Sequence, residues 1–290
     1  MPAPEIQWYP GHIAKAEKAL VDQLNRVDVV LEVRDARIPL ATRHPNVDQW
    51  VGDKGRVLVL NRVDMISDAA KAAWEDWFRQ QGERPLFTNA QHGQGVKAIA
   101  KAAQAAGDSV NQRRQTRGMK PRPIRAVVIG FPNVGKSALI NRLLNRKVAA
   151  SARRAGITRQ LRWIRLSGDL DLLDAPGVIP SRLDDQDAAL KLAICDDIGE
   201  AAYDTQRTAA AFLDLLKGLE QTQSQDTYQE ILQARYGLDL SQHTGEAFVA
   251  QLASEKFQDD QERTAKRILN DFRTGFLGHW VLEWPFDPAN

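Results

Sequence analysis

The sequence predicts an α/β fold with a mostly parallel sheet and helices on both faces, followed by a small all-helical domain. Strand-like and helix-like segments alternate up to about residue 182, and only helical periodicity follows. The chain has 290 residues, which is enough for one large core and a smaller one. We therefore expect two domains, at 1–181 and 182–290.

Buried strands are expected where short runs of β-branched and aliphatic residues end in polar or glycine-containing turns. The clearest run is Val27-Asp28-Val29-Val30-Leu31-Glu32-Val33. The strands predicted in this way are, in order, 27–33, 56–60, 85–88, 124–129 and 170–173. Because helices separate most of them, neighbouring strands should run parallel.

Helices are expected where apolar residues recur at intervals of three and four. Trp74, Trp77 and Phe78 follow this spacing and indicate a face packed in the core. In the first domain, the helices are 13–24, the segment with these aromatic residues, and the alanine-rich 96–106. In the second domain, they lie near 184–198, 204–218, 225–236, 244–254 and 258–273. The basic stretch at about 108–123 holds two prolines and is expected to be a connector.

The composition argues against several classes of protein. The single cysteine, Cys195, cannot form an intramolecular disulfide and agrees with a reducing compartment. The N-terminus lacks the basic and apolar regions of a signal peptide, and no stretch approaches the roughly 18 apolar residues of a membrane-spanning helix. We expect a cytoplasmic protein that does not bind membranes.

The charged residues are distributed unevenly, although the formal net charge is only +2. Between Val110 and Gly168 there are fifteen Lys and Arg residues and no acid, whereas from Asp169 onward acids outnumber bases by 23 to 10. Arg and Lys supply most contacts to phosphates, so the basic window predicts a nucleic-acid footprint. The residues predicted to contact RNA are Arg113, Arg114, Arg117, Lys120, Arg153 and Arg154.

A phosphate-binding motif follows the strand expected at 124–129. The run Gly130-Phe131-Pro132-Asn133-Val134-Gly135-Lys136-Ser137 fits G-x-x-x-x-G-K-[S/T], the P-loop pattern, and opens a helix. Its backbone amides and the lysine would bind nucleotide phosphates, and the serine hydroxyl would bind Mg²⁺. The residues predicted to bind the nucleotide here are Asn133, Val134, Gly135, Lys136, Ser137 and Ala138.

Two further motifs predict that the base is guanine. Asn61-Arg62-Val63-Asp64 resembles the N-K-x-D motif, in which the carboxylate accepts N1–H and the exocyclic amine of guanine. Adenine has no such pair of donors. Arg62 replaces the usual lysine, but its stem can still cover the base. Asn89 and Ala90 follow a strand and resemble the motif whose alanine amide contacts guanine O6.

The remaining motifs are those that sense the γ-phosphate. Asp174-Ala175-Pro176-Gly177 fits D-x-x-G, which predicts that Asp174 lies near Mg²⁺ and contacts it through water. The same motif predicts that the Gly177 amide lies near the γ-phosphate. Thr158, in Gly156-Ile157-Thr158, is the expected switch hydroxyl for Mg²⁺. The residue after Gly177 is Val178, at the position where Ras-like proteins have a glutamine that orients water.

The order of these motifs is unusual. The base-binding motifs at 61–64 and 88–90 precede the phosphate-binding motifs at 130–137, 158 and 174–177. A circular permutation keeps such a site intact when the original termini lie close together at the surface, as termini often do. The first domain is therefore expected to be a circularly permuted Ras-like P-loop GTPase domain.

Taken together, the motifs resemble those of the ribosome biogenesis GTPase A family. The resemblance includes the opening Trp8-Tyr9-Pro10-Gly11-His12 and the closing Asp271-Phe272-Arg273-Thr274-Gly275, and it covers nearly the whole chain. It implies a monomeric, cytosolic GTPase that acts late in large-subunit assembly, binds ribosomal RNA and the immature 50S particle, and is stimulated by that particle. It also implies that His12 is the catalytic residue that orients water.

Several alternatives remain at this point. The protein could be a GTP-dependent RNA-binding checkpoint with negligible turnover, which Val178 favours, or an ATPase or nucleoside kinase, which Asp64 argues against. Asn133 also matches GTPases that place a potassium ion beside the phosphates, although the same residue occurs without that dependence. The aromatic tail after Gly278 is expected to pack against the protein rather than to form a docking patch.

Overall fold

The computed structural model describes residues 6, 11–145, 161–166, 169–175, 177–180, 183–219 and 228–285, with only the backbone for 11–16 and 162. Arg153, Arg154 and Thr158 lie outside the described residues. No helix in these ranges is long and apolar enough to cross a membrane.

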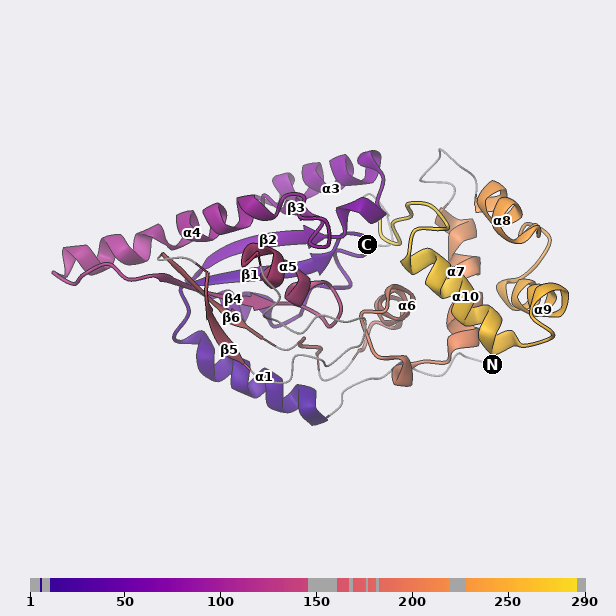
Figure 1. Cartoon of the computed structure of the whole chain (residues 1–290), viewed down its shortest axis with the longest axis horizontal. Coiled ribbons are helices and arrows are strands. Elements are labelled where there is room, and N and C mark those ends of the chain that lie inside the picture. The colour runs from indigo at the N-terminus through magenta and orange to yellow at the C-terminus, as the bar shows by residue number, and fades with distance from the viewer. Residues whose placement is uncertain are drawn as a thin grey trace.

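A six-stranded sheet forms the centre of the first domain, with the strand order β3-β2-β1-β4-β6-β5 (Figure 1). The strands are β1 (Val29–Asp35), β2 (Gly55–Asn61), β3 (Leu86–Thr88), β4 (Ile124–Ile129), β5 (Arg162–Arg165) and β6 (Leu170–Asp174). All neighbours pair in parallel except β5, which is antiparallel to β6. The expected α/β fold with a mostly parallel sheet is confirmed, but β5 was not among the predicted strands.

Helices cover both faces of this sheet because alternate residues of each strand point to opposite sides. On one face, Val127 and Ile129 of β4 pack with Leu20 of α1 and Trp50 of α2. Farther along that face, β2 packs against α3, and on the opposite face α4 and α5 cover β1, β2 and β4. The helices are α1 (Gly11–Leu24), α2 (Val47–Val51), α3 (Asp68–Gln80), α4 (Val96–Thr116) and α5 (Lys136–Leu143).

A buried ion pair interrupts the apolar pattern of the central strand. Glu32 and Arg34 of β1 are 2% and 1% exposed, and their side chains are 2.6 Å apart. Arg56 of β2 reaches the same carboxylate at 2.6 Å. Removal of one member of such a pair would leave a buried charge without its partner and destabilise the fold.

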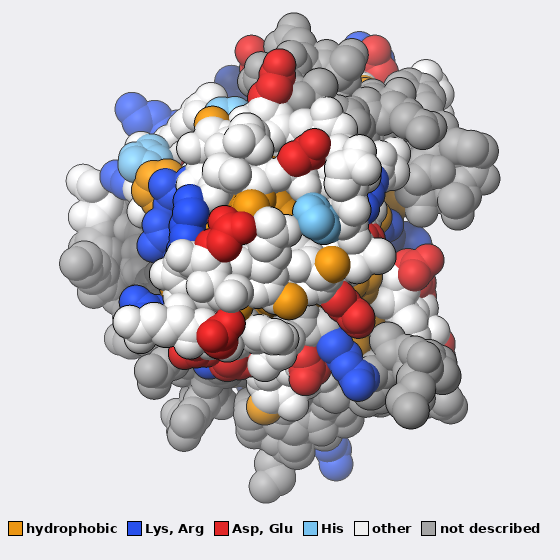
Figure 2. Space-filling model, turned by 90° about the vertical axis from the view of Figure 1, so that its right-hand side faces the viewer, with side chains coloured by type: hydrophobic (Ala, Val, Ile, Leu, Met, Phe, Trp, Pro, Cys, Tyr) orange, Lys and Arg blue, Asp and Glu red, His pale blue; other side chains and the backbone are white. Residues whose placement is uncertain are grey.

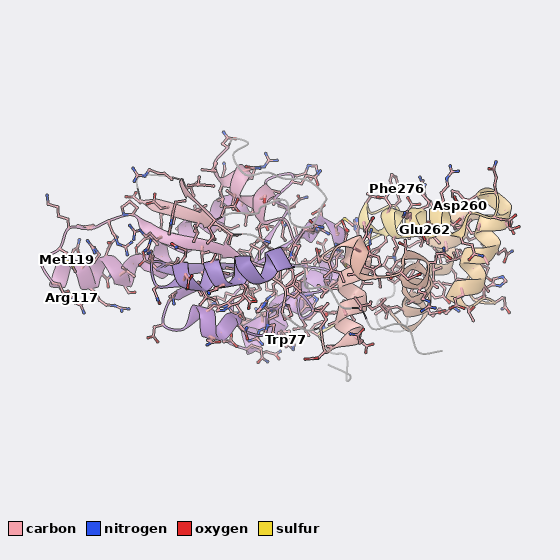
Figure 3. The ribbon with its side chains drawn as sticks, turned by 90° about the horizontal axis from the view of Figure 1, so that it is seen from below. Trp77, Arg117, Met119, Asp260, Glu262 and Phe276 are labelled. Atoms are coloured by element: carbon pink, nitrogen blue, oxygen red, sulfur yellow. The ribbon has the colours of Figure 1, made fainter. Side chains whose placement is uncertain are left out.

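Helix α4 is longer than the sequence pattern suggested and projects beyond the sheet (Figure 1). It continues to Thr116, so the first part of the expected connector at 108–123 is helical. The Asn111 amide explains this extension, because it donates to the Arg122 carbonyl at 3.0 Å and accepts from the Arg122 amide at 3.1 Å. Figure 3 shows Arg117 and Met119 at the resulting tip, at the far end of the molecule from Phe276.

The described part of the chain after the sheet is helical, as predicted. Its elements are α6 (Gln186–Cys195), the short turn η2 (Glu200–Ala202), α7 (Thr205–Leu219), α8 (Tyr228–Tyr236), α9 (Gly245–Lys256) and α10 (Gln261–Arg273). Its core is continuous with the core that lies under α4 and α5. On the face shown in Figure 2, the described acidic and basic side chains are interspersed, and hydrophobic side chains form only small patches.

The C-terminal tail packs back onto the first domain. Glu283 accepts hydrogen bonds from the backbone amides of Leu40 and Ala41, at 2.7 and 3.0 Å. The Leu282 amide donates to the Arg37 carbonyl at 2.9 Å, and Trp280 is 5% exposed. The tail is therefore packed against the protein, as expected, as far as residue 285, where the described part ends.

Protonation of a buried histidine predicts an acid-dependent loss of stability. His44 is 3% exposed and stacks on Trp50 at 4.2 Å, and burial lowers its pKa from 6.5 to about 4. Because the unfolded chain binds this proton more readily, stability should fall as the pH drops from about 6.5 to about 4, by about 3 kcal/mol from this residue. Chemical denaturation at several pH values would measure the change.

A substitution at His44 should remove this component of the pH dependence. His44→Gln keeps an acceptor for the Asn46 amide, which bonds to His44 Nδ1 at 3.1 Å. The exposed His92 gives a matched control, and His92→Gln should keep the wild-type pH dependence. An unchanged acid dependence in His44→Gln would contradict the prediction.

Candidate functional site

The predicted motifs meet at one edge of the sheet. Parallel strands place their carboxyl ends together, which is where ligands bind in open α/β sheets. In the register of the sheet, Asp35 lies opposite Asn61, and Asn61 lies opposite Thr88. The P-loop follows β4 at this same edge. The structure therefore brings together the segments predicted to bind the base and the phosphates, despite their permuted order.

The P-loop has the backbone conformation that its glycines permit. Gly130 and Gly135 have φ values of 149° and 101°, and Asn133 lies between them at 57°. A Cβ on Gly135 would overlap the Asn61 side-chain nitrogen, and one on Gly130 would overlap the Val33 carbonyl. Helix α5 begins at Lys136, so its free amides face the loop and favour an anion there.

Lys136 is buried inside the loop. Its ammonium donates to the carbonyls of Gly130 and Phe131, at 3.0 and 2.6 Å. Burial lowers the pKa of Lys136 to about 8, while the charges of Asp174 and Asp197 oppose that shift. A phosphate group would give this ammonium an anionic partner at the amino end of α5.

Asn61 joins three segments of the site through one side chain. Its amide nitrogen donates to the Val134 carbonyl at 2.8 Å. Its oxygen accepts from the Thr88 hydroxyl at 3.1 Å and from the Ala90 amide at 3.0 Å. Asn61 is 4% exposed, so these bonds are shielded from water. The residue therefore fixes the P-loop relative to both base-binding loops.

The rest of the two base-binding motifs surrounds this junction. Val63 is buried, whereas Asp64 is exposed in the short turn η1 (Val63–Met65). Ala90 is buried, and Asn89 accepts from the His92 amide at 3.0 Å. Asp64 is therefore accessible to a ligand, as its predicted contact with the base requires.

Arg62 links the base-binding loop to the P-loop and to the helical domain. It has a left-handed backbone, with φ 65°. Its guanidinium donates to the carbonyls of Asn133 and Cys195, at 2.6 and 3.4 Å, and lies 3.1 Å from Asp35. An arginine can form this fork of contacts, whereas a lysine ammonium is a single point of charge.

A buried cluster of charges lies beside Arg62, and the sequence motifs did not indicate it. Arg37 binds Asp35 through two bonds, at 3.0 and 2.7 Å, and also donates to the Cys195 carbonyl at 3.1 Å. Burial opposes ionisation of Asp35, but the charges of Arg37 and Arg62 hold its pKa below the usual value. Burial raises the pKa of Asp197 well above its usual range, and Asp35 adds to that effect.

The D-x-x-G segment packs directly against the P-loop. A Cβ on Gly177 would lie 2.7 Å from Pro132 Cα, and the Val178 amide donates to the Gly130 carbonyl at 3.1 Å. Asp174 is 4% exposed at the end of β6, close enough to Lys136 to affect its pKa. Val178 is fully buried in the core beneath α1, so its side chain does not reach the surface beside the P-loop.

Other predicted residues are placed differently or fall outside the described part of the chain. Thr158, Arg153 and Arg154 belong to the latter group, and for His12 only the backbone, in the first turn of α1, is described. The side chain of Asn133 donates to the Asp196 carbonyl at 2.6 Å. The segment 161–166 holds β5, whose four residues Arg162-Trp163-Ile164-Arg165 show no clear alternation in sequence.

The predicted RNA-contacting residues in the described part form a group at the tip of α4. Arg113 donates to the Ser109 hydroxyl at 3.4 Å, and Arg114 donates twice to the Lys120 carbonyl at 3.1 Å. Arg117 and Lys120 are exposed. By contrast, Arg122 of the same basic window is bound to Asp28 at 2.7 Å, so that arginine has a structural partner.

Comparisons with known proteins agree with these motifs. The model of a family described as 50S ribosome-binding GTPase matches residues 125–236. The chain is 34% identical to ribosome biogenesis GTPase A of Bacillus cereus, over 97% of this chain and 94% of that protein. It is 31% identical to ribosome biogenesis GTPase A of Thermotoga maritima, over 70% of each chain.

A solved structure has the same fold. The crystal structure of GNP-bound YlqF from T. maritima superimposes with a TM-score of 0.63 and is 24% identical, covering 94% of this chain and 99% of that one. A GDP-bound structure of T. maritima YlqF gives the same TM-score of 0.63.

Proposed function

We propose that this chain, which belongs to the ribosome biogenesis GTPase A family of GTP hydrolases, uses GTP to control a step in assembly of the large ribosomal subunit. Membership of this family argues against the ATPase or nucleoside kinase interpretation. The observation that carries the proposal is the Asn61 side chain, which joins the P-loop to both base-binding loops. This geometry would couple base recognition to the phosphate site.

The proposed nucleotide contacts follow from this arrangement. Amides of the P-loop and the start of α5 would hold the phosphates, Lys136 would neutralise their charge, and the Gly177 amide would sense the γ-phosphate. Asp64 and the Ala90 amide would read guanine. The proposed nucleotide-binding residues are Asn61, Arg62, Val63, Asp64, Asn89, Ala90, Asn133, Val134, Gly135, Lys136, Ser137, Ala138 and Gly177.

The same site offers oxygen ligands suited to Mg²⁺. Ser137 is the second residue of α5. The buried Asp174 lies close enough to Lys136 to influence the pKa of the lysine. Hydroxyl and carboxylate oxygens are the ligands that Mg²⁺ prefers. We propose that Ser137, Thr158 and Asp174 hold Mg²⁺, with Asp174 acting through water. When bound, Mg²⁺ would neutralise charge that develops on the phosphates.

An Asp64 substitution should change base specificity. Asp64→Asn replaces one acceptor oxygen by an amide donor, so a donor would face the guanine donors. GTP affinity should fall by about 30-fold, from the loss of charged hydrogen bonds. Xanthosine triphosphate, which has a carbonyl at C2, should bind the variant more tightly than GTP. Competition binding with GTP, ATP and xanthosine triphosphate would test this, and unchanged GTP preference would contradict the assignment of Asp64.

We propose that His12 orients the attacking water. Val178 occupies the position of the usual glutamine, and it is fully buried in the α1 core. Another polar group is therefore required, and His12 lies in the first turn of α1, close to the amino end of that helix. Asn133 is proposed to hold K⁺ beside the phosphates, which would require its side chain to leave the Asp196 carbonyl.

The proposed macromolecular partner is the large ribosomal subunit with its ribosomal RNA. The support is the group of basic side chains at the α4 tip, in a window of the sequence that contains no Asp or Glu. The proposed RNA contacts are Arg113, Arg114, Arg117, Lys120, Arg153 and Arg154. The helical domain at 182–290 would contribute a second part of the contact. We also propose that the free protein is a monomer located in the cytoplasm.

The direct test is GTP hydrolysis by the purified protein with and without large ribosomal subunits, in KCl and in NaCl. Strong stimulation by the particles supports the proposed function, and a higher rate in KCl supports the role of Asn133. The alternative is a GTP-dependent checkpoint with negligible turnover, which the buried Val178 favours. Particles that bind in a GTP-dependent manner without accelerating hydrolysis would support that alternative.

A further inference from the structure

A surface pocket of about 330 Å³ lies away from the GTP motifs. It is lined by Arg26, Arg125, Trp163, Ile164, Arg165 and Asp171. Arg125 and Asp171 are each the second residue of their strand, β4 and β6, whereas the P-loop follows the last residue of β4. The pocket therefore lies at the amino ends of these strands, whereas the predicted GTP site lies at the carboxyl ends.

The pocket exists because α1 stops short of this edge. Along β4, Arg125 points to the same face as Val127 and Ile129, which pack beneath α1. The helix ends at Leu24, and Arg26 lies two residues beyond that end. Beyond the helix, the side chains on this face of the sheet change from apolar to charged.

The charges in the pocket favour an anion. Across the three strands, Asp171 lies opposite both Arg125 and Arg165 in register. Asp171 is the one acid of the lining, and Arg165 already pairs with it at 3.3 Å. No carboxylate in the described part of the chain pairs with Arg26 or Arg125, which leaves an excess of positive charge.

Trp163 adds an aromatic surface to these charges. It is 39% exposed, although it is a large aromatic residue on a short strand. The Arg125 guanidinium lies 5.8 Å from the centre of its ring, which restrains the indole by a cation–π contact. Proteins that bind single-stranded nucleic acid combine positive charge with aromatic side chains on which the bases stack.

We propose that this pocket binds one nucleotide of single-stranded RNA, with its base stacked on Trp163 and its phosphate paired with Arg26 and Arg125. A single strand is required because the bases of a duplex stack on one another and cannot reach the ring. The inference rests on the proposed function in that RNA is the partner. It adds a specific site to the general basic tip of α4, which joins β4 just before Arg125.

Fluorescence anisotropy of the full chain with a labelled single-stranded RNA of mixed sequence, about ten nucleotides long, would test the pocket. Trp163→Ala should weaken binding by about tenfold and leave the slope of log affinity against log salt unchanged. Trp163→Phe should retain most of the affinity. Arg26→Gln combined with Arg125→Gln should reduce that slope by about 0.7, because one phosphate contact is lost.

Two controls separate this site from general effects. Val21→Ala removes another exposed apolar side chain, 45% exposed on α1 and outside the pocket lining, and it should leave RNA affinity unchanged. The same RNA annealed to its complement should bind wild type and Trp163→Ala equally. Basal GTP hydrolysis should be unchanged in the Trp163 and arginine variants, and the arginine pair keeps the test valid if Trp163→Ala does not fold.

The outcomes distinguish the pocket from the proposed function. Wild-type affinity and salt slope in the Trp163 and arginine variants would overturn the pocket and leave the proposed function standing. Failure of the wild type to bind the single strand, while it still binds large subunits, would do the same. Failure to bind single-stranded RNA, duplex RNA and large subunits would overturn both.

Discussion

Gly135→Ala is expected to abolish GTP binding, with an affinity loss of at least about 100-fold, which corresponds to about 3 kcal/mol. The new Cβ would overlap the Asn61 side-chain nitrogen, and Gly135 has a φ of 101°, which an alanine rarely adopts. Asn61 would have to move, and its bonds to Val134, Thr88 and Ala90 would break. Titration with a fluorescent GTP analogue would measure the loss.

Gly118→Ala provides the matched control for this substitution. Gly118 also has a left-handed backbone, with φ 70°, but a Cβ there would meet nothing within 4 Å. Both variants therefore carry the backbone strain of an alanine at positive φ, and only Gly135→Ala disturbs the Asn61 junction. Equal GTP affinities in the two variants would show that the junction does not organise the nucleotide site.

His12→Ala is expected to lower hydrolysis stimulated by large subunits by about 100- to 10,000-fold, the range typical of a positioned acid–base group. GTP affinity should stay close to that of the wild type, because the proposed nucleotide contacts come from other segments. Single-turnover hydrolysis with saturating particles separates the chemical step from binding and release.

The exposed His279 provides a matched control for His12. His279→Ala removes an imidazole from the end of the chain and should keep the full stimulated rate. Val178→Gln should not rescue His12→Ala, because residue 178 points into the core beneath α1. A stimulated rate in His12→Ala equal to the wild type would remove His12 from the mechanism.

The sequence was most informative where chemistry depends on short motifs. The glycines of the P-loop and the polar residues at strand ends identify the site because a few residues, close in sequence, impose both backbone shape and ligand contacts. Asn61 is an example, since its motif predicted both a strand end and a base-binding loop. The mostly parallel sheet followed from the alternation of strands and helices. The roles of His12 and Thr158 stay predictions.

The features that were missed depend on contacts between distant segments. The bond from Arg37 to the Cys195 carbonyl joins residues 158 positions apart, and no local pattern marks it. The buried Asp197 lies in no recognisable motif, and its pKa is raised by burial and by the charge of Asp35, which is distant in sequence. Strand β5 has only four residues, too short for a secure periodicity. The extra length of α4 likewise depends on the pairing of Asn111 with Arg122.

The buried pair of Glu32 and Arg34 also bears on the risk of aggregation while the chain is being synthesised. Strand β1 leaves the ribosome early, but its neighbour β4 begins 89 residues after β1 ends. At translation rates of roughly 5–20 residues per second, about 5 to 20 s pass before that neighbour exists. During this interval β1 has an open edge, and charged residues within a strand discourage pairing with other nascent chains. We therefore expect the charged residues of β1 to limit pairing of its open edge with other nascent chains until β4 has been made.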